Sequence, residues 1–219
     1  MKKLLISLST LLVLFLNGCV PTTGPNLKSA SELSKIAEKN SSIVFGKIEW
    51  IENGEKKVFK EEGLMGTWIK PNLMNMEDET KIECDISEGG EFVWSLPPGK
   101  YLMHKIHYRD SWSGSYFIVP KVVFNVPEKG KVYYIGTLKG ESRTKRNLMG
   151  DLSSVTKFTV QDKFNQDARN FKRKFSTSSK KIKKSLMIHD ERLPQTPETT
   201  AEYNIAMNLI NGILMGISQ

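Results

Sequence analysis

The 219-residue sequence predicts a mainly β fold, an antiparallel sandwich of seven or more strands with a short N-terminal helix and C-terminal amphipathic helices. First, short segments of alternating apolar and polar residues recur from Ile43 to Leu138 at intervals of about 8–12 residues, separated by turn-forming residues. Second, apolar residues on either side of this region recur at helical spacing. These patterns divide the chain into residues 1–18, 19–42, 43–162 and 163–219.

Residues 1–18 have the pattern of an export signal. Lys2 and Lys3 precede a nearly unbroken apolar run from Leu4 to Leu16. A membrane-spanning helix needs about 20 apolar residues, and this shorter run ends in Asn-Gly-Cys-Val-Pro without a basic flank. We therefore expect a signal peptide that is removed after Gly18.

The stretch Leu16-Asn17-Gly18-Cys19 resembles the lipobox of bacterial lipoproteins, from which Asn17 departs because Ala, Ser or Thr is usual there. The resemblance implies cleavage between Gly18 and Cys19, a diacylglycerol on the Cys19 thiol and a further acyl chain, such as palmitate, on its amine. Two or more acyl chains anchor a protein stably. In the same pattern, an Asp directly after the lipidated cysteine favours retention of the protein in the inner membrane. This chain has Val20 there, which implies sorting to the outer membrane in a bacterium with two membranes. The alternative is an ordinary secretion signal with an incidental cysteine.

Residues 19–42 are expected to form a lipidated tether and a short helix. From Val20 to Asn26 the chain is nearly uncharged and rich in Pro, Gly and Thr, which is typical of a flexible linker. Ser29 and Glu32 match a capping box, and the apolar residues that follow are at helical spacing. We expect this helix to reach about Lys39.

Turn signals decide where the strands of residues 43–162 are expected. Asn53-Gly54 is a strong hairpin signal, and Pro97-Pro98-Gly99 has the residues of a type II turn after which the chain returns. Polar loops are expected at Pro71–Glu79 and at residues 141–147. The expected strands are Ile43–Trp50, a return strand from Val58, Leu64–Lys70, Lys81–Ile86, Glu91–Leu96, Tyr101–Tyr108, Tyr116–Val119, Lys121–Val126, Val132–Leu138 and Val155–Gln161.

Two stretches of this region resemble the prealbumin-like sandwich modules, which include carboxypeptidase-regulatory-like domains. They are Phe-Val-Trp-Ser-Leu-Pro-Pro-Gly-Lys-Tyr at 92–101 and Phe-Asn-Val-Pro-Glu-Lys-Gly-Lys-Val-Tyr-Tyr-Ile-Gly at 124–136. The resemblance covers about Ile43 to Leu138 and implies the fold. It implies little about function, because such modules are mostly non-catalytic scaffolds.

The region 163–219 is expected to contain two amphipathic helices. Phe164, Ala168, Phe171 and Phe175 share one helical face, which either packs on the sandwich or lies on a membrane surface. A second helix, Glu198 to about Ile217, either docks on the domain or binds a partner. Between them, Ile182, Leu186 and Ile188 share a face if the chain is extended.

The C-terminal region also carries a run of basic residues within a short window that contains no acid, in a chain of net charge +8. The run is either a solvated face that maintains solubility or, in the functional interpretation, a contact with an anionic envelope surface. The residues are Arg169, Lys172, Arg173, Lys174, Lys180, Lys181, Lys183 and Lys184.

Few residues point to catalysis or metal binding. His104 and His107 fall on opposite faces of a strand unless a bulge intervenes, so we expect no metal site. No nucleotide-binding or catalytic motif is present, and no cofactor is expected. If Cys19 carries lipid, Cys84 has no partner, and the alternation around it predicts a small buried thiol.

We therefore expect a non-enzymatic cell-envelope lipoprotein, with a structural or binding role, that is held to the membrane by its lipid anchor. The expected partner is an envelope protein or an anionic polymer, and nucleic acid is not expected. One alternative is an envelope hydrolase acting on cell-wall or lipid material, with a site around His104, Asp110 and Ser113. The other is an accessory lipoprotein of a secretion or pilus complex.

Overall fold

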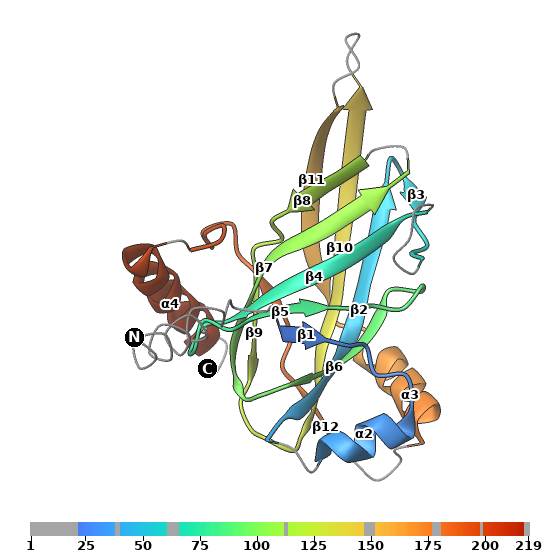
Figure 1. Ribbon diagram of the computed structural model, residues 1–219, viewed down its shortest axis with the longest axis vertical. Helices are drawn as coiled ribbons and strands as arrows, with labels where there is room; N and C mark the ends of the chain where they lie inside the picture. The colour runs from blue at the N-terminus through green and yellow to red at the C-terminus, as the bar shows by residue number, and fades with distance from the viewer. Residues whose placement is uncertain are drawn as a thin grey trace, which may run out of the picture.

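The computed structural model describes residues 22–37, 40–60, 66–111, 114–146, 152–176, 181–197 and 199–216. Within these ranges the chain forms two β sheets around one main apolar core, and helices lie on the outer faces (Figure 1). The predicted mainly β sandwich with flanking helices is confirmed.

The first sheet, sheet A, has seven strands within the described residues. They are β1 (Thr22–Gly24), β4 (Trp68–Asn75), β5 (Lys81–Cys84), β7 (Gly99–Asp110), β8 (Gly114–Ile118), β9 (Val122–Val126) and β13 (Ile188–His189). Their order is β1-β5-β4-β7-β9-β13, and β8 pairs with β7. All pairings in sheet A are antiparallel except that between β1 and β5.

The second sheet, sheet B, has six strands within the same residues. They are β2 (Ser42–Glu52), β3 (Glu55–Lys56), β6 (Glu91–Leu96), β10 (Val132–Arg146), β11 (Leu152–Gln161) and β12 (Ile182–Lys184). Their order is β11-β10-β2-β3, while β6 pairs with β2 and β12 with β10. The central strands β2 and β10 are parallel, and most of sheet A is built by the chain that connects them, because parallel neighbours need a long crossover.

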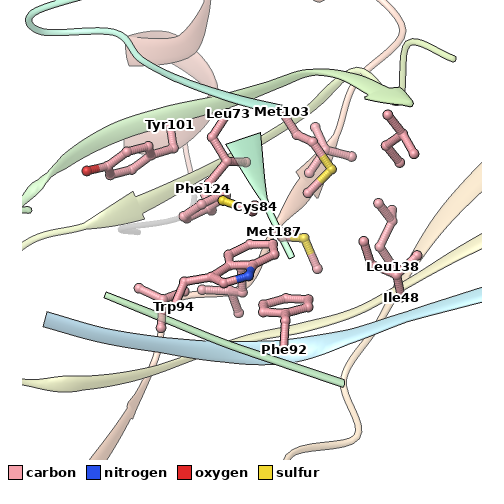
Figure 2. Packing of buried hydrophobic residues seen from close by; sticks show 14 of the residues in the cluster. Ile48, Leu73, Cys84, Phe92, Trp94, Tyr101, Met103, Phe124, Leu138 and Met187 are labelled. Carbon is pink, nitrogen blue, oxygen red and sulfur yellow. The ribbon is translucent and has the colours of Figure 1, made fainter. Parts of the chain in front are cut away.

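The core between the sheets is rich in large side chains. Phe92 and Trp94 of sheet B stack with ring centroids 3.8 Å apart (Figure 2). Leu73 and Met103 face them from sheet A. Cys84 lies in the same core as a free, buried thiol, as predicted, and burial raises its pKa well above the usual value.

The Leu-Pro-Pro-Gly segment is a corner between the two sheets. β6 ends at Leu96 in sheet B, and β7 begins at Gly99 in sheet A, so the chain crosses the sandwich instead of returning beside β6. The buried Tyr101 stabilises this corner, since its hydroxyl donates a hydrogen bond to the carbonyl of Pro97 over 2.8 Å.

Three expectations about loops and strands are wrong. The predicted loop at Pro71–Glu79 is strand as far as Asn75, and Pro71 is tolerated because it lies just before the pairing with β5 begins at Asn72. The predicted loop after Gly140 continues β10 to Arg146, where the hairpin with β11 extends beyond β2 and alternation with buried residues is no longer required. The return strand after Asn53-Gly54 is only the short β3.

The helices are α2 (Ala30–Ala37), α3 (Phe164–Phe175) and α4 (Thr200–Met215). The predicted cap of α2 is present, as the Ser29 hydroxyl accepts a hydrogen bond from the Glu32 amide over 3.3 Å. The apolar stripe of α3 packs on the outer face of sheet B, and α4 packs against sheet A on the other side of the sandwich (Figure 1). Of the two alternatives left open for each helix, the structure therefore shows packing on the sandwich. No helix in the described ranges has the length and apolarity needed to cross a bilayer.

The segment between α3 and α4 changes sheets. β12 pairs with β10 in sheet B, whereas β13 pairs with β9 in sheet A. Ile182 and Leu186 consequently pack beside α3, while Ile188 packs beside α4. The expectation that these three residues share one face is wrong, because the chain crosses the edge of the sandwich between them.

The chain before α2 is part of the sheets and not a tether. Thr22–Gly24 pairs with β5 as β1. The buried Asn26 follows, and its side chain accepts a hydrogen bond from the Val93 amide over 2.8 Å and donates one to the Glu91 carbonyl over 3.3 Å. The flexible tether expected up to Asn26 is therefore wrong from Thr22 onward. Gly18, Cys19 and the predicted signal peptide lie outside the described residues.

Candidate functional site

A groove of about 550 Å³ runs along α3, between the helix and strands β2 and β6 of sheet B. It exists because the helix is held on the sheet by one apolar stripe, with Phe171 stacked on Phe45 and Phe175 buried beside them. The flank of the helix next to this stripe therefore stands over the outward-facing residues of β2. Phe45, Phe92, Val93, Phe171 and Phe175 supply the apolar part of the lining.

The polar part of the lining has more cations than anions. Three acids line it, Glu49, Glu91 and Asp167. The five basic residues of the lining are Lys47, Lys56, Lys163, Arg173 and Lys174. With five positive and three negative side chains, the groove has a formal charge of +2.

The two glutamates are held by lysines. Lys47 Nζ lies 2.6 Å from the Glu91 carboxylate, and Glu49 is shared by Lys163 at 3.0 Å and Lys56 at 3.7 Å. Burial alone would raise the pKa of Glu49 and of Glu91. The lysine contacts outweigh burial and lower both pKa values below the usual value, so both side chains are ionised at neutral pH.

Asp167 has hydroxyl partners. Its carboxylate accepts hydrogen bonds from the Tyr134 hydroxyl over 2.9 Å and from the Thr137 hydroxyl over 3.3 Å. Burial, together with the adjacent Asp167, raises the pKa of Tyr134, so this phenol stays neutral and remains a donor. These contacts fix the N-terminal half of α3 on β10.

Arg173 and Lys174 account for the surplus of positive charge. Both are exposed, and within the described part of the chain neither has a carboxylate partner. The Arg173 guanidinium donates a hydrogen bond to the Asn170 side chain over 3.3 Å, and Lys174 Nζ lies 5.4 Å from the centre of the Phe175 ring. These two side chains are therefore available to an anion from solution.

The structure divides the predicted basic run into three groups. Arg173 and Lys174 line the groove, while Arg169, Lys172 and Lys181 are exposed outside it. Lys183 pairs with Glu128 over 2.6 Å, and Lys184 pairs with Asp162 over 2.8 Å. Lys180 lies outside the described residues.

Sequence reasoning missed Lys47, Lys56 and Lys163, which line the groove. A partial signal was present, because alternation along β2 places Lys47 and Glu49 on the same face as Phe45. Nothing local in the sequence indicates that this face lies beside α3.

The residues of the hydrolase alternative are not brought together. His104 and Asp110 lie six residues apart on β7, a separation of roughly 20 Å along a strand. The buried His104 has Nδ1 3.1 Å from the Thr196 hydroxyl, and Asp110 accepts a hydrogen bond from Thr67 over 2.5 Å. Ser113 lies outside the described residues.

The two histidines of β7 have separate environments. The pairing of β7 with β4 skips His104, so β7 has a β-bulge at this residue. The strict alternation that would place the two histidines on opposite faces of the strand is therefore interrupted between them. His107 Nε2 lies 2.7 Å from the hydroxyl of the exposed Ser115, whereas His104 contacts Thr196. No group of three or more His, Cys, Asp or Glu residues suited to a metal ion occurs among the described residues.

Comparison of the chain with known protein families, with curated proteins and with solved structures finds no match.

Proposed function

We propose that this chain is a non-enzymatic cell-envelope lipoprotein, anchored through Cys19, that binds an anionic component of the envelope surface. The observation that carries the proposal is the outward side of α3. Arg169, Lys172, Arg173 and Lys174 are all exposed there, and none has a carboxylate partner among the described residues.

Electrostatics and the anchor act together in this proposal. Each Lys or Arg close to an anionic membrane contributes about 1 kcal/mol of attraction. A lipid anchor combined with a basic surface is a two-signal arrangement that holds a protein stably at a bilayer. The Leu-Asn-Gly-Cys sequence supports the first signal, and the face of α3 supports the second.

Metabolic labelling with palmitate tests the anchor. We expect label in the unmodified protein and in the Cys84→Ala variant, and none in the Cys19→Ala variant. The two variants are matched because the sequence contains only these two cysteines. Label that persists in Cys19→Ala would refute the anchor at this residue.

Chemical protection tests the basic surface. The native lipoprotein is reconstituted into phosphatidylcholine vesicles with or without phosphatidylglycerol and treated with an amine-reactive label, and modified lysines are found by mass spectrometry. We expect phosphatidylglycerol to protect Lys172 and Lys174 and high salt to abolish the protection. The exposed Lys157 on β11 is the control and should react equally in both vesicles. Equal reaction of all three lysines would contradict the proposal.

A second candidate, an accessory lipoprotein of an envelope complex, is favoured by the far end of the β10–β11 hairpin. Beyond Ser142, β10 no longer pairs with β2, although it stays paired with β11. Val155 on this extension is 76% exposed. The outer edges of the two-stranded extension are open to strand addition by another chain. We expect Val155→Glu to release a co-purifying protein that Val58→Glu, at a comparably exposed site on the sandwich, retains.

A further inference from the structure

The groove along α3 has a charge and a lining that specify a ligand class. Lys47, Lys56 and Lys163 together offset the three acids of the lining, two of which, Glu49 and Glu91, they contact directly, and this leaves the positive surplus on Arg173 and Lys174. A cleft with one dominant sign of charge focuses its field on the solvent inside it and concentrates counter-ions there. The occupant favoured by this arrangement is therefore an anion.

The donors present suit a phosphoryl group. Free phosphate carries between one and two negative charges at neutral pH and a phospholipid phosphodiester carries one, and both offer strong acceptor oxygens, so the surplus of +2 attracts either form of the group. A guanidinium such as that of Arg173 donates two parallel hydrogen bonds to phosphate oxygens, and a lysine ammonium such as that of Lys174 adds a mobile point charge.

We infer that the groove between α3 and strands β2 and β6 binds a phosphoryl group through Arg173 and Lys174. The inference rests on the proposed function, because it names the anionic chemistry that the outward side of α3 recognises. It is narrower, since it assigns binding to the groove residues and not to Arg169 and Lys172, which lie on the same helix outside the groove.

Two sources could supply this group, a phospholipid headgroup or free phosphate. The apolar floor under the cations includes Phe45 and Phe171, so the glycerol part of a headgroup would find a partly apolar surface. Titration with and without an anionic lipid separates the two sources.

The test is calorimetric titration of the full-length lipoprotein in zwitterionic micelles with sodium phosphate, against sodium chloride at the same ionic strength. The groove variant is Arg173→Gln with Lys174→Gln, and the control is Arg169→Gln with Lys172→Gln. Both remove two charges from exposed positions of one helix, so both should fold, which thermal melting checks. We expect saturable phosphate binding that falls about tenfold or more in the groove variant and less than about twofold in the control.

Micelles doped with phosphatidylglycerol identify the source. If the headgroup occupies the groove, doping weakens phosphate binding to the unmodified protein; if free phosphate is the ligand, doping leaves its affinity unchanged. Both results support the site. Equal loss in the two variants would overturn it in favour of diffuse charge, and heat no larger than in chloride would overturn it outright. Failure of palmitate labelling at Cys19 would remove the anchor while leaving phosphate binding, so the two proposals fail separately.

Discussion

Phe171 of α3 stacks on Phe45 of β2, with ring centroids 4.3 Å apart and an interplanar angle of 18°. This pair holds the helix against the sheet and forms part of the floor of the groove. The position of the basic residues of α3 therefore depends on an apolar contact between segments that are distant in sequence.

Truncation of Phe171 should destabilise the fold. The side chain is 4% exposed, and Phe→Ala substitutions at buried sites cost about 3–5 kcal/mol. We expect Phe171→Ala to reduce the free energy of urea unfolding by this amount. Lys172→Ala, at the next and exposed position, should change it by less than about 0.5 kcal/mol. Similar values for the two variants would contradict the packing of α3.

Stability should fall as the solution becomes acidic, because of His104. Burial, with added repulsion from Lys105 and Lys81, lowers the pKa of His104 from 6.5 to about 4. Between these values the unfolded chain binds a proton that the folded chain does not, so stability decreases as pH falls from about 6.5 and the loss is complete near pH 4. The shift corresponds to about 3 kcal/mol.

Urea unfolding at a series of pH values measures this effect. His104→Gln keeps a polar side chain at this position but removes the proton-binding group, so its stability should vary less between pH 6.5 and 4. Parallel pH profiles for the two proteins would show that His104 is not responsible.

Two glycines should respond to alanine in opposite directions. Gly99, at the corner between the sheets, has φ of +153°, and an added Cβ would lie 3.0 Å from the Asn75 side-chain oxygen. We expect Gly99→Ala to destabilise the protein by about 1–3 kcal/mol. Gly212 lies in α4, where an added Cβ meets nothing within 4 Å, so Gly212→Ala should stabilise by up to about 1 kcal/mol. Thermal melting compares them, and a shared sign would contradict this account.

The Cys84 thiol should be inert in the folded protein. It is fully buried, and its raised pKa leaves almost no thiolate at neutral pH. We expect no reaction with a thiol reagent until denaturant unfolds the chain, after which Cys84 reacts at the ordinary rate. Rapid modification under native conditions would mean that this part of the core opens.

Local rules predicted the features that depend on neighbouring residues. The hairpin at Asn53-Gly54 was predictable because both residues adopt positive φ, 52° and 88°, as such a turn requires. The extension of β10 past Gly140 was not, because its residues are polar and those after Ser142 pair with β11 alone, where burial imposes no pattern. The groove could not be predicted either, since Lys163 and Glu49 meet across 114 residues of chain and only the packing of α3 brings them together.

If Cys19 is acylated, the position of β1 limits how far the N-terminal edge of sheet A can lie from the bilayer. Three residue steps separate Cys19 from Thr22, the first residue of this strand, and a fully extended chain advances at most about 3.6 Å per residue. If Cys19 is acylated, the edge of sheet A is confined within about 11 Å of the lipid attachment point. Such a short linker would keep this edge of the domain close to the bilayer surface. An acylated protein of this kind would meet its partners mainly by lateral diffusion in the membrane.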